Sequence, residues 1–246
     1  MRAAPAPSRR AVLTGGLGLA AAAVLPRPAW ALSARLNTQV LGELGAGGWT
    51  LVDAAAGGTV TLRRKTLASV GRVAWQGERD LDPRLAGADF YAVLADIEGH
   101  RRFVPGLAAS VVFEQEGDHA AFYQVLQAPD FTPVADRFWV SEARGYRAIG
   151  GDPRRFRRAW SSQPAPAHAA ARQQVLERFP EAVEVGFTHG TWELSGAANG
   201  GLHVVFSVVS DPGGALPKGM ASTIAGHNIP ETIRTMEKEA LRRLGG

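Results

Sequence analysis

The chain has 246 residues, of which 27 are Lys or Arg, 23 are Asp or Glu and none is Cys. Four of the basic residues and no acidic residue precede Leu32, so the remainder is formally neutral, which argues against a nucleic-acid-binding surface. The lack of Cys excludes disulfides, thiolate metal ligands and a thiol nucleophile, so stability must come from a hydrophobic core.

The first 31 residues have the pattern of an export signal. Ser8-Arg9-Arg10-Ala11-Val12-Leu13 is a twin-arginine pattern, and an uncharged run extends from Ala11 to Leu25. Ala29-Trp30-Ala31 then has the small-x-small pattern of a signal-peptidase site. We expect residues 1–31 to be a twin-arginine signal peptide and 32–246 to form one periplasmic or otherwise exported domain. The alternative is an uncleaved membrane anchor.

Hydrophobic periodicity and Gly-rich turns predict the elements of that domain. In chain order they are a helix at 32–44, strands at 49–52, 59–62 and 70–81, a short helix at 88–94, strands at 109–116, 120–127, 134–147 and 154–162, a surface helix or crossover at 165–179, and strands at 182–194 and 202–210. A long closing helix follows Pro217. Antiparallel hairpins dominate this pattern, so the predicted class is α+β.

The closing helix is amphipathic. Its apolar face includes Met220, Ile224, Ile229 and Ile233 at helical spacing. Pro230 lies inside it, and because proline removes a helical hydrogen bond, we expect a kink or break near Asn228.

Several motifs resemble the START family, the steroidogenic-acute-regulatory-related lipid-transfer domains of the Bet v 1-like superfamily. In chain order, these motifs are Trp49 before a hairpin, the short helix before Pro105, Tyr123, Pro133-Val-Ala-Asp-Arg137, Gly190-Thr-Trp-Glu-Leu194 and Asp211-Pro-Gly-Gly-Ala-Leu-Pro217. The resemblance covers 32–244. It implies a helix-grip fold, in which about nine antiparallel strands curve around the C-terminal helix and enclose an apolar cavity for a lipid or sterol.

The resemblance also implies a gate formed by the closing helix and the loop 128–134. Pro129 and Pro133 restrict this loop, and Phe131 lies between them. Phe131 either gates the cavity or packs on the body of the domain. For Asp136 and Arg137, strand alternation allows only one of the two to enter the cavity, and a salt bridge at the strand edge is the alternative.

Strand alternation also suggests which residues contact a ligand. If Phe156 and Trp160 face inward, Arg158 does so too, and it either meets a polar ligand head or extends to the cavity mouth. In 183–193 the odd positions, which include Phe187 and His189, change from apolar residues at the start to polar residues at the end. A cavity wall with an apolar end and a polar end would have this pattern.

In 202–210 the face of Phe206 is continuously apolar, and we take it as the inner face. From the closing helix, Met220, Ile224 and Asn228 complete the expected ligand contacts.

The expected function is therefore non-enzymatic binding and transfer of a hydrophobic ligand, with transient contact to a membrane surface. The alternative is an enzyme on the same scaffold, resembling aromatic polyketide cyclases, in which Arg158, Glu193 and His189 converge. We expect no cofactor and no metal, because the six His residues lack ligand spacing. A monomer is expected, although the sequence leaves oligomeric state open.

Overall fold

The structure is a computed structural model that describes residues 29–52, 60–128, 134–198, 200–214 and 220–245. Side chains are described from residue 34 and, within the last stretch, from residue 228. The gate-loop residues Pro129, Phe131 and Pro133 and the side chains of Met220 and Ile224 therefore lie outside the described part.

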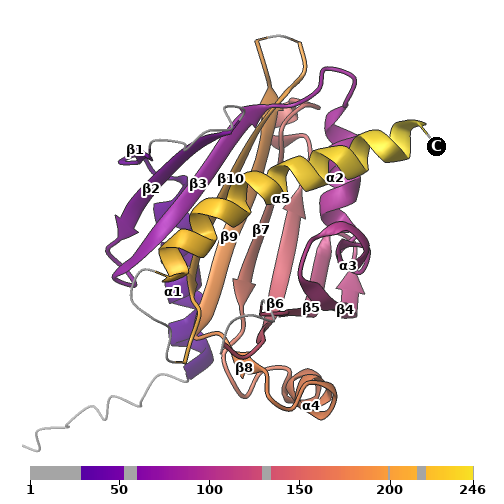
Figure 1. Ribbon diagram of the computed structural model, residues 1–246. Helices are drawn as coiled ribbons and strands as arrows, with labels where there is room; N and C mark the ends of the chain where they lie inside the picture. The colour runs from indigo at the N-terminus through magenta and orange to yellow at the C-terminus, as the bar shows by residue number, and fades with distance from the viewer. Residues whose placement is uncertain (1–28, 53–59, 129–133, 199, 215–219, 246) are drawn as a thin grey trace, which may run out of the picture.

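In the described part of the chain, ten strands form one curved sheet in the order β1-β2-β3-β10-β9-β7-β6-β5-β4, with β8 beside β6 (Figure 1). The strands are β1 (Thr50–Val52), β2 (Thr61–Leu67), β3 (Arg72–Asp80), β4 (Leu107–Glu116), β5 (His119–Leu126), β6 (Arg137–Tyr146), β7 (Phe156–Ser162), β8 (Val183–Glu184), β9 (Phe187–Gly196) and β10 (Leu202–Asp211). Neighbouring strands are antiparallel except β6 and β8.

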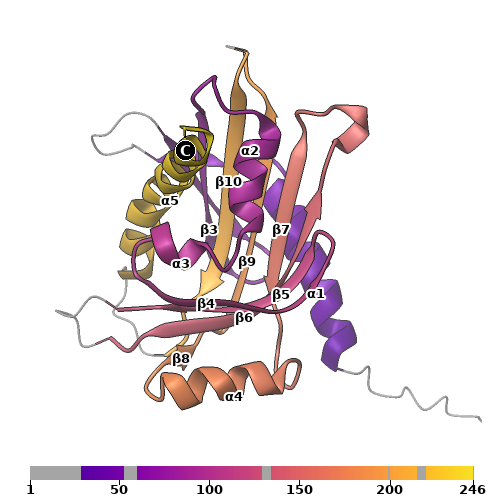
Figure 2. The same cartoon turned by 90° about the vertical axis from the view of Figure 1, so that its right-hand side faces the viewer.

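Helices cover both faces of the sheet. They are α1 (Ala29–Gly45), α2 (Gly87–Ala95), α3 (His100–Phe103), α4 (Ala169–Arg178) and α5 (Met220–Gly245), with a 3₁₀ turn at Ile149–Gly151. Figure 2 shows α5, α2 and α3 on one side of the sheet, which we call the concave face, and α1 on the other, which we call the convex face. The convex face is covered by α1 next to β9 and β2 and by α4 next to β5 and β6.

Close packing at one edge of the sheet positions α5. Ile229 and Ile233 are buried from its sheet-facing side and lie over Gly77 of β3. A Cβ atom at Gly77 would lie 2.6 Å from Cγ2 of Ile229 and 2.9 Å from Cδ1 of Ile233, so the missing side chain allows the close approach. Farther along, α5 packs against α2. The helix is thus supported by β3 on one side and by α2 on the other.

Ion pairs hold the second half of α5. Glu237 accepts a hydrogen bond from the backbone N–H of Asp82 (2.8 Å) and pairs with Arg79 of β3 (3.0 Å). Near its end, Arg243 pairs with Asp96 after α2 (2.6 Å) and with Glu239 (2.8 Å). Burial raises the pKa of Asp96, but hydrogen bonds from Arg243 and Gly99 and nearby positive charge outweigh it, so the net pKa is lowered.

The α+β, helix-grip prediction is confirmed, with local corrections. The predicted strand 182–194 is interrupted after Glu184, and its first part pairs with β6 while the rest pairs with β10. Helix α5 continues through Pro230, so a break there is wrong. The cost of Pro in a helix, about 3 kcal/mol, is offset by burial of Ile229 and Ile233 on either side of it. None of the helices described is long and apolar enough to cross a membrane.

Removing the packing of α5 should destabilise the whole domain. Ile233→Ala deletes a side chain with no exposed surface and is expected to lower the free energy of unfolding by about 2–5 kcal/mol. The matched control is Leu244→Ala on the same helix, where the side chain is 48 % exposed and the expected change stays within about 0.5 kcal/mol. Urea unfolding followed by circular dichroism measures both, and equal losses would contradict the packing described.

Candidate ligand-binding site

The candidate site lies on the concave face, beneath α5. Strand register defines this face, because Gly77, Phe206, Trp192, Arg158 and Gly145 are consecutive partners across five strands. Directly paired residues share a face of a sheet. Since Gly77 faces α5, the whole row does so too.

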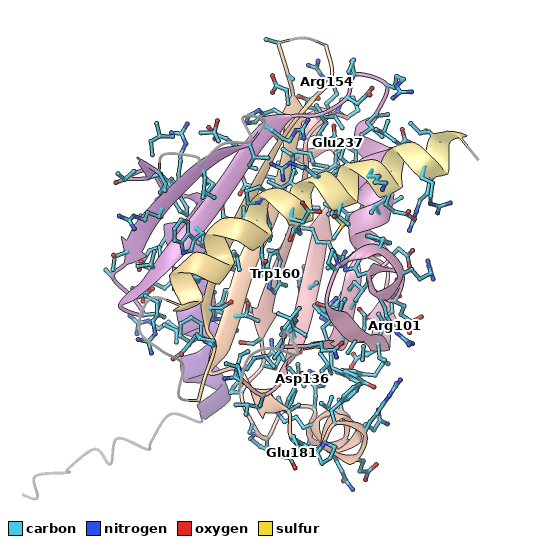
Figure 3. The ribbon with its side chains drawn as sticks, viewed as in Figure 1. Arg101, Asp136, Arg154, Trp160, Glu181 and Glu237 are labelled. Carbon is cyan, nitrogen blue, oxygen red and sulfur yellow. The ribbon has the colours of Figure 1, made fainter. Side chains whose placement is uncertain are left out.

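Stacked aromatic rings form the floor of the site. Phe206 lies between two indoles, 4.1 Å from Trp192 and 5.8 Å from Trp160, measured between ring centroids. Gly190 makes room for the Trp160 ring, since a Cβ atom there would lie 2.2 Å from it. Phe206 and Trp192 are buried, whereas Trp160, near the middle of the sheet in Figure 3, retains accessible surface. The floor is thus apolar and is only partly covered by protein.

A cluster of neutral polar groups lies farther along the same face, where β4 and β5 meet α3. Gln124 donates to the hydroxyl of Ser110 (2.9 Å), and that hydroxyl donates to the carbonyl of Ile97 (2.5 Å). The His100 ring lies 3.1 Å from the carbonyl of Val93 through Nε2 and 3.4 Å from the Gln124 amide through Nδ1. Burial lowers the pKa of His100 to about 4, so the ring is neutral at neutral pH.

Arg158 lies buried between the aromatic floor and Tyr91. It is only 5 % exposed, and no described carboxylate lies within ion-pair distance of its guanidinium. Tyr91 is fully buried, and its hydroxyl donates to Asp118 (3.1 Å). Burial raises the pKa of Tyr91, which the charge of Arg158 opposes. Arg158 is therefore a buried cation whose charge is only partly compensated. Its guanidinium can donate hydrogen bonds to an anionic or polar group of a ligand.

The predicted site residues divide between the two faces. Arg158, Trp160 and Phe206 lie together on the concave face, which agrees with taking the face of Phe206 as the inner one. Phe187 and His189 lie on the convex face, where Phe187 packs with Val40 of α1, so placing them in the same cavity as Phe206 is wrong.

The physical reason is that the α1 cluster covers the apolar start of the odd positions of β9, so an apolar Phe187 does not mark the concave face. Asn228 is exposed rather than enclosed, because helical periodicity directs Ile229 and Ile233 to the sheet.

The residues of the cyclase-like alternative do not converge. Arg158 faces α5, whereas Glu193 and His189 share the opposite face, and Glu193 lies 3.7 Å from Arg157 there. In the described ranges, no group of three or more His, Asp or Glu residues is placed to hold a metal ion.

The polar cluster of His100, Ser110 and Gln124 was not singled out from sequence. A signal was present, because Gln124 is a polar residue in an otherwise apolar strand. Only the fold shows that it faces His100 and Ser110.

Comparisons with known proteins agree with this architecture. The family model described as polyketide cyclase / dehydrase and lipid transport matches residues 87–237. No curated protein matches the chain in sequence.

Solved structures with the same fold include lipid-transfer proteins. A STAR-related lipid transfer protein fragment from Xanthomonas axonopodis is 22 % identical, with a TM-score of 0.62, over 79 % of this chain and 99 % of its own. Human StAR-related lipid transfer protein 5 is 12 % identical, with a TM-score of 0.67, over 88 % of this chain and 98 % of its own.

The Zhui aromatase/cyclase from Streptomyces sp. R1128 is 15 % identical over 70 % of this chain and 96 % of its own, with a TM-score of 0.46, which is too low to bear on fold or activity. At such identities the two lipid-transfer structures show a shared fold, and they do not show a shared ligand.

Proposed function

Because the chain belongs to the polyketide cyclase / dehydrase and lipid transport family, we propose that it binds a lipid, sterol or similar hydrophobic molecule on the concave face and carries it unchanged. The observation that carries this proposal is the partial exposure of Trp160 at the centre of that face. In a fully packed interior this indole would be as buried as its neighbours Phe206 and Trp192, which are 8 % and 6 % exposed.

The placement of α5 supports a space above this floor. The helix rests on β3 and on α2, and α2 itself packs on Trp192 of β9 and Phe156 of β7 through Phe90 and Tyr91. Val208 of β10 and Trp160 of β7 both pack at the margin of the concave cluster and both keep accessible surface. A hydrophobic ligand covering them gains about 0.8 kcal/mol for each buried CH₂ group.

Polar groups at one side of the floor fit the head group of such a ligand. Arg158 offers a buried positive charge, and the Gln124 and His100 cluster offers neutral hydrogen-bonding groups. A carboxylate or hydroxyl head near these groups would leave the apolar part of the molecule over Trp160 and Phe206. No covalent step is required, so we propose a binding and transfer protein that exchanges its ligand by transient contact with a membrane surface.

A substitution that fills the space should separate this proposal from simple surface adsorption. Val208→Trp places an indole on the concave face and is expected to weaken binding of a fluorescent fatty acid or sterol at least tenfold. Val205→Trp is the matched control, because it introduces the same ring on the opposite face of the same strand and should leave binding within about twofold. Fluorescence titration measures both. Equal affinities of the two variants, or no binding by the wild type at micromolar concentrations, would contradict the proposal.

We propose that the protein acts after export by the twin-arginine route, on the strength of Arg9 and Arg10 and the pattern that follows them. Replacing both with Lys should leave the protein in the cytoplasmic fraction, while the wild type is recovered outside it. Cell fractionation with immunodetection decides this, and unchanged export of the double variant would contradict the route.

A further inference from the structure

A second hollow lies where α1 crosses the end of β7, and it extends from the convex face into the opening of the sheet. It lies between α1 and the ends of β6, β7 and β9 and has a volume of about 380 Å³. We call it the α1 pocket. Leu36, Asn37, Phe187 and His189 line it from the convex side. Trp139 and Ser162 line its inner end and belong to the concave face, because their strand partners are Gln124 and Ser141.

The pocket exists because the sheet separates at this point. The paired residues of β6 and β7 end at Ser141 and Ser162, and the first residues of β6 pair with β8 instead. The pairing of β7 with β9 ends at Ser161 and His189. The sheet therefore opens between β6 and β9, and α1 passes over the opening.

His189 marks the pocket as a site for a polar group. The residue is only 2 % exposed, and its ring stacks on Phe187 with centroids 5.5 Å apart. Its Nδ1 is buried and has no hydrogen-bond partner among the described residues. A buried nitrogen without a partner is costly, and native structures nearly always supply one.

The chemistry of the site favours an uncharged ligand. Burial lowers the pKa of His189 to about 4, so at neutral pH the ring has one N–H donor and one acceptor nitrogen. A hydroxyl group can donate or accept and so complements either tautomer. The remaining lining is largely apolar, with Leu36, Trp139 and Phe187 among it.

The volume sets the size of the ligand. An apolar cavity of about 150 Å³ accommodates one benzene molecule. A pocket of about 380 Å³ therefore accommodates a molecule of about two rings. We propose that the α1 pocket binds a small two-ring alcohol or phenol, with its rings against Phe187 and Leu36 and its hydroxyl hydrogen-bonded to Nδ1 of His189.

Two probes of nearly equal size test the hydrogen bond. The full chain should bind 2-naphthol about tenfold more tightly than naphthalene, measured by calorimetry or by probe fluorescence. His189→Phe keeps a ring of similar size and removes the nitrogen, so it should abolish this preference while leaving naphthalene affinity within about twofold.

The matched control is His203→Phe, on the same face of the neighbouring strand and outside the pocket lining, and it should retain the preference. Equal affinity of the wild type for the two probes, or an undiminished preference in His189→Phe, would overturn the proposal.

A second variant locates the probe and does not depend on the folding of His189→Phe. Asn37→Trp fills the pocket from a partly exposed position on α1 and should weaken binding of both probes at least tenfold. Saturating the concave face with a fatty acid should leave 2-naphthol binding unchanged. Displacement of 2-naphthol by the fatty acid, or its loss in Val208→Trp and not in Asn37→Trp, would assign the probe to the concave face and overturn the α1 pocket. The two proposed sites can therefore fail separately.

Discussion

The close approach of α5 to β3 at Gly77 sets the geometry on which the rest of the structure depends. A side chain at this position would collide with Ile229 and Ile233, so glycine lets the helix lie directly against one strand near the edge of the sheet. Beyond β3 the helix packs on α2. The helix is therefore supported at one edge of the sheet by β3 and elsewhere by α2, whose Phe90 packs on Trp192 of β9.

Buried charge fixes the second half of the helix in this position. Glu237, which Figure 3 labels, lies on α5. Its carboxylate pairs with Arg79 and accepts a hydrogen bond from the N–H of Asp82. The side chains of Arg79 and Glu237 are only 19 % and 10 % accessible, so loss of one partner would leave the other poorly solvated. These contacts attach the second half of the helix to the end of β3 and to the segment that follows it.

The fold could be predicted because its signals are local and repeated. Hairpin turns, alternation along strands and the Asp211–Pro217 motif before the closing helix each indicate the same arrangement. The choice of face is different, because alternation gives two faces and does not say which one a helix covers. Phe206 was assigned to the inner face on continuous apolarity, and its location agrees. Phe187 was assigned by the same kind of pattern, but the apolar surface that buries it belongs to α1.

Other features depend on contacts between distant segments and have no local signal. The strand predicted at 182–194 divides because Val183 pairs with Arg137 of β6, while Phe187 pairs with Asp211 of β10. This division opens the sheet and creates the pocket that His189 lines. The two proposed sites differ in chemistry, because a buried charge lies beside the concave floor and a neutral imidazole lines the α1 pocket.

The central claim is that a hydrophobic ligand occupies the space between α5 and the concave face. A crystal structure with a fatty acid brominated at the chain end tests it most directly, because anomalous scattering locates the bromine without reference to the protein. The account predicts a bromine peak over the aromatic floor, in contact with Trp160 or Val208. A peak confined to the convex face or the outer surface, with the concave face filled by the protein's own side chains, would contradict it.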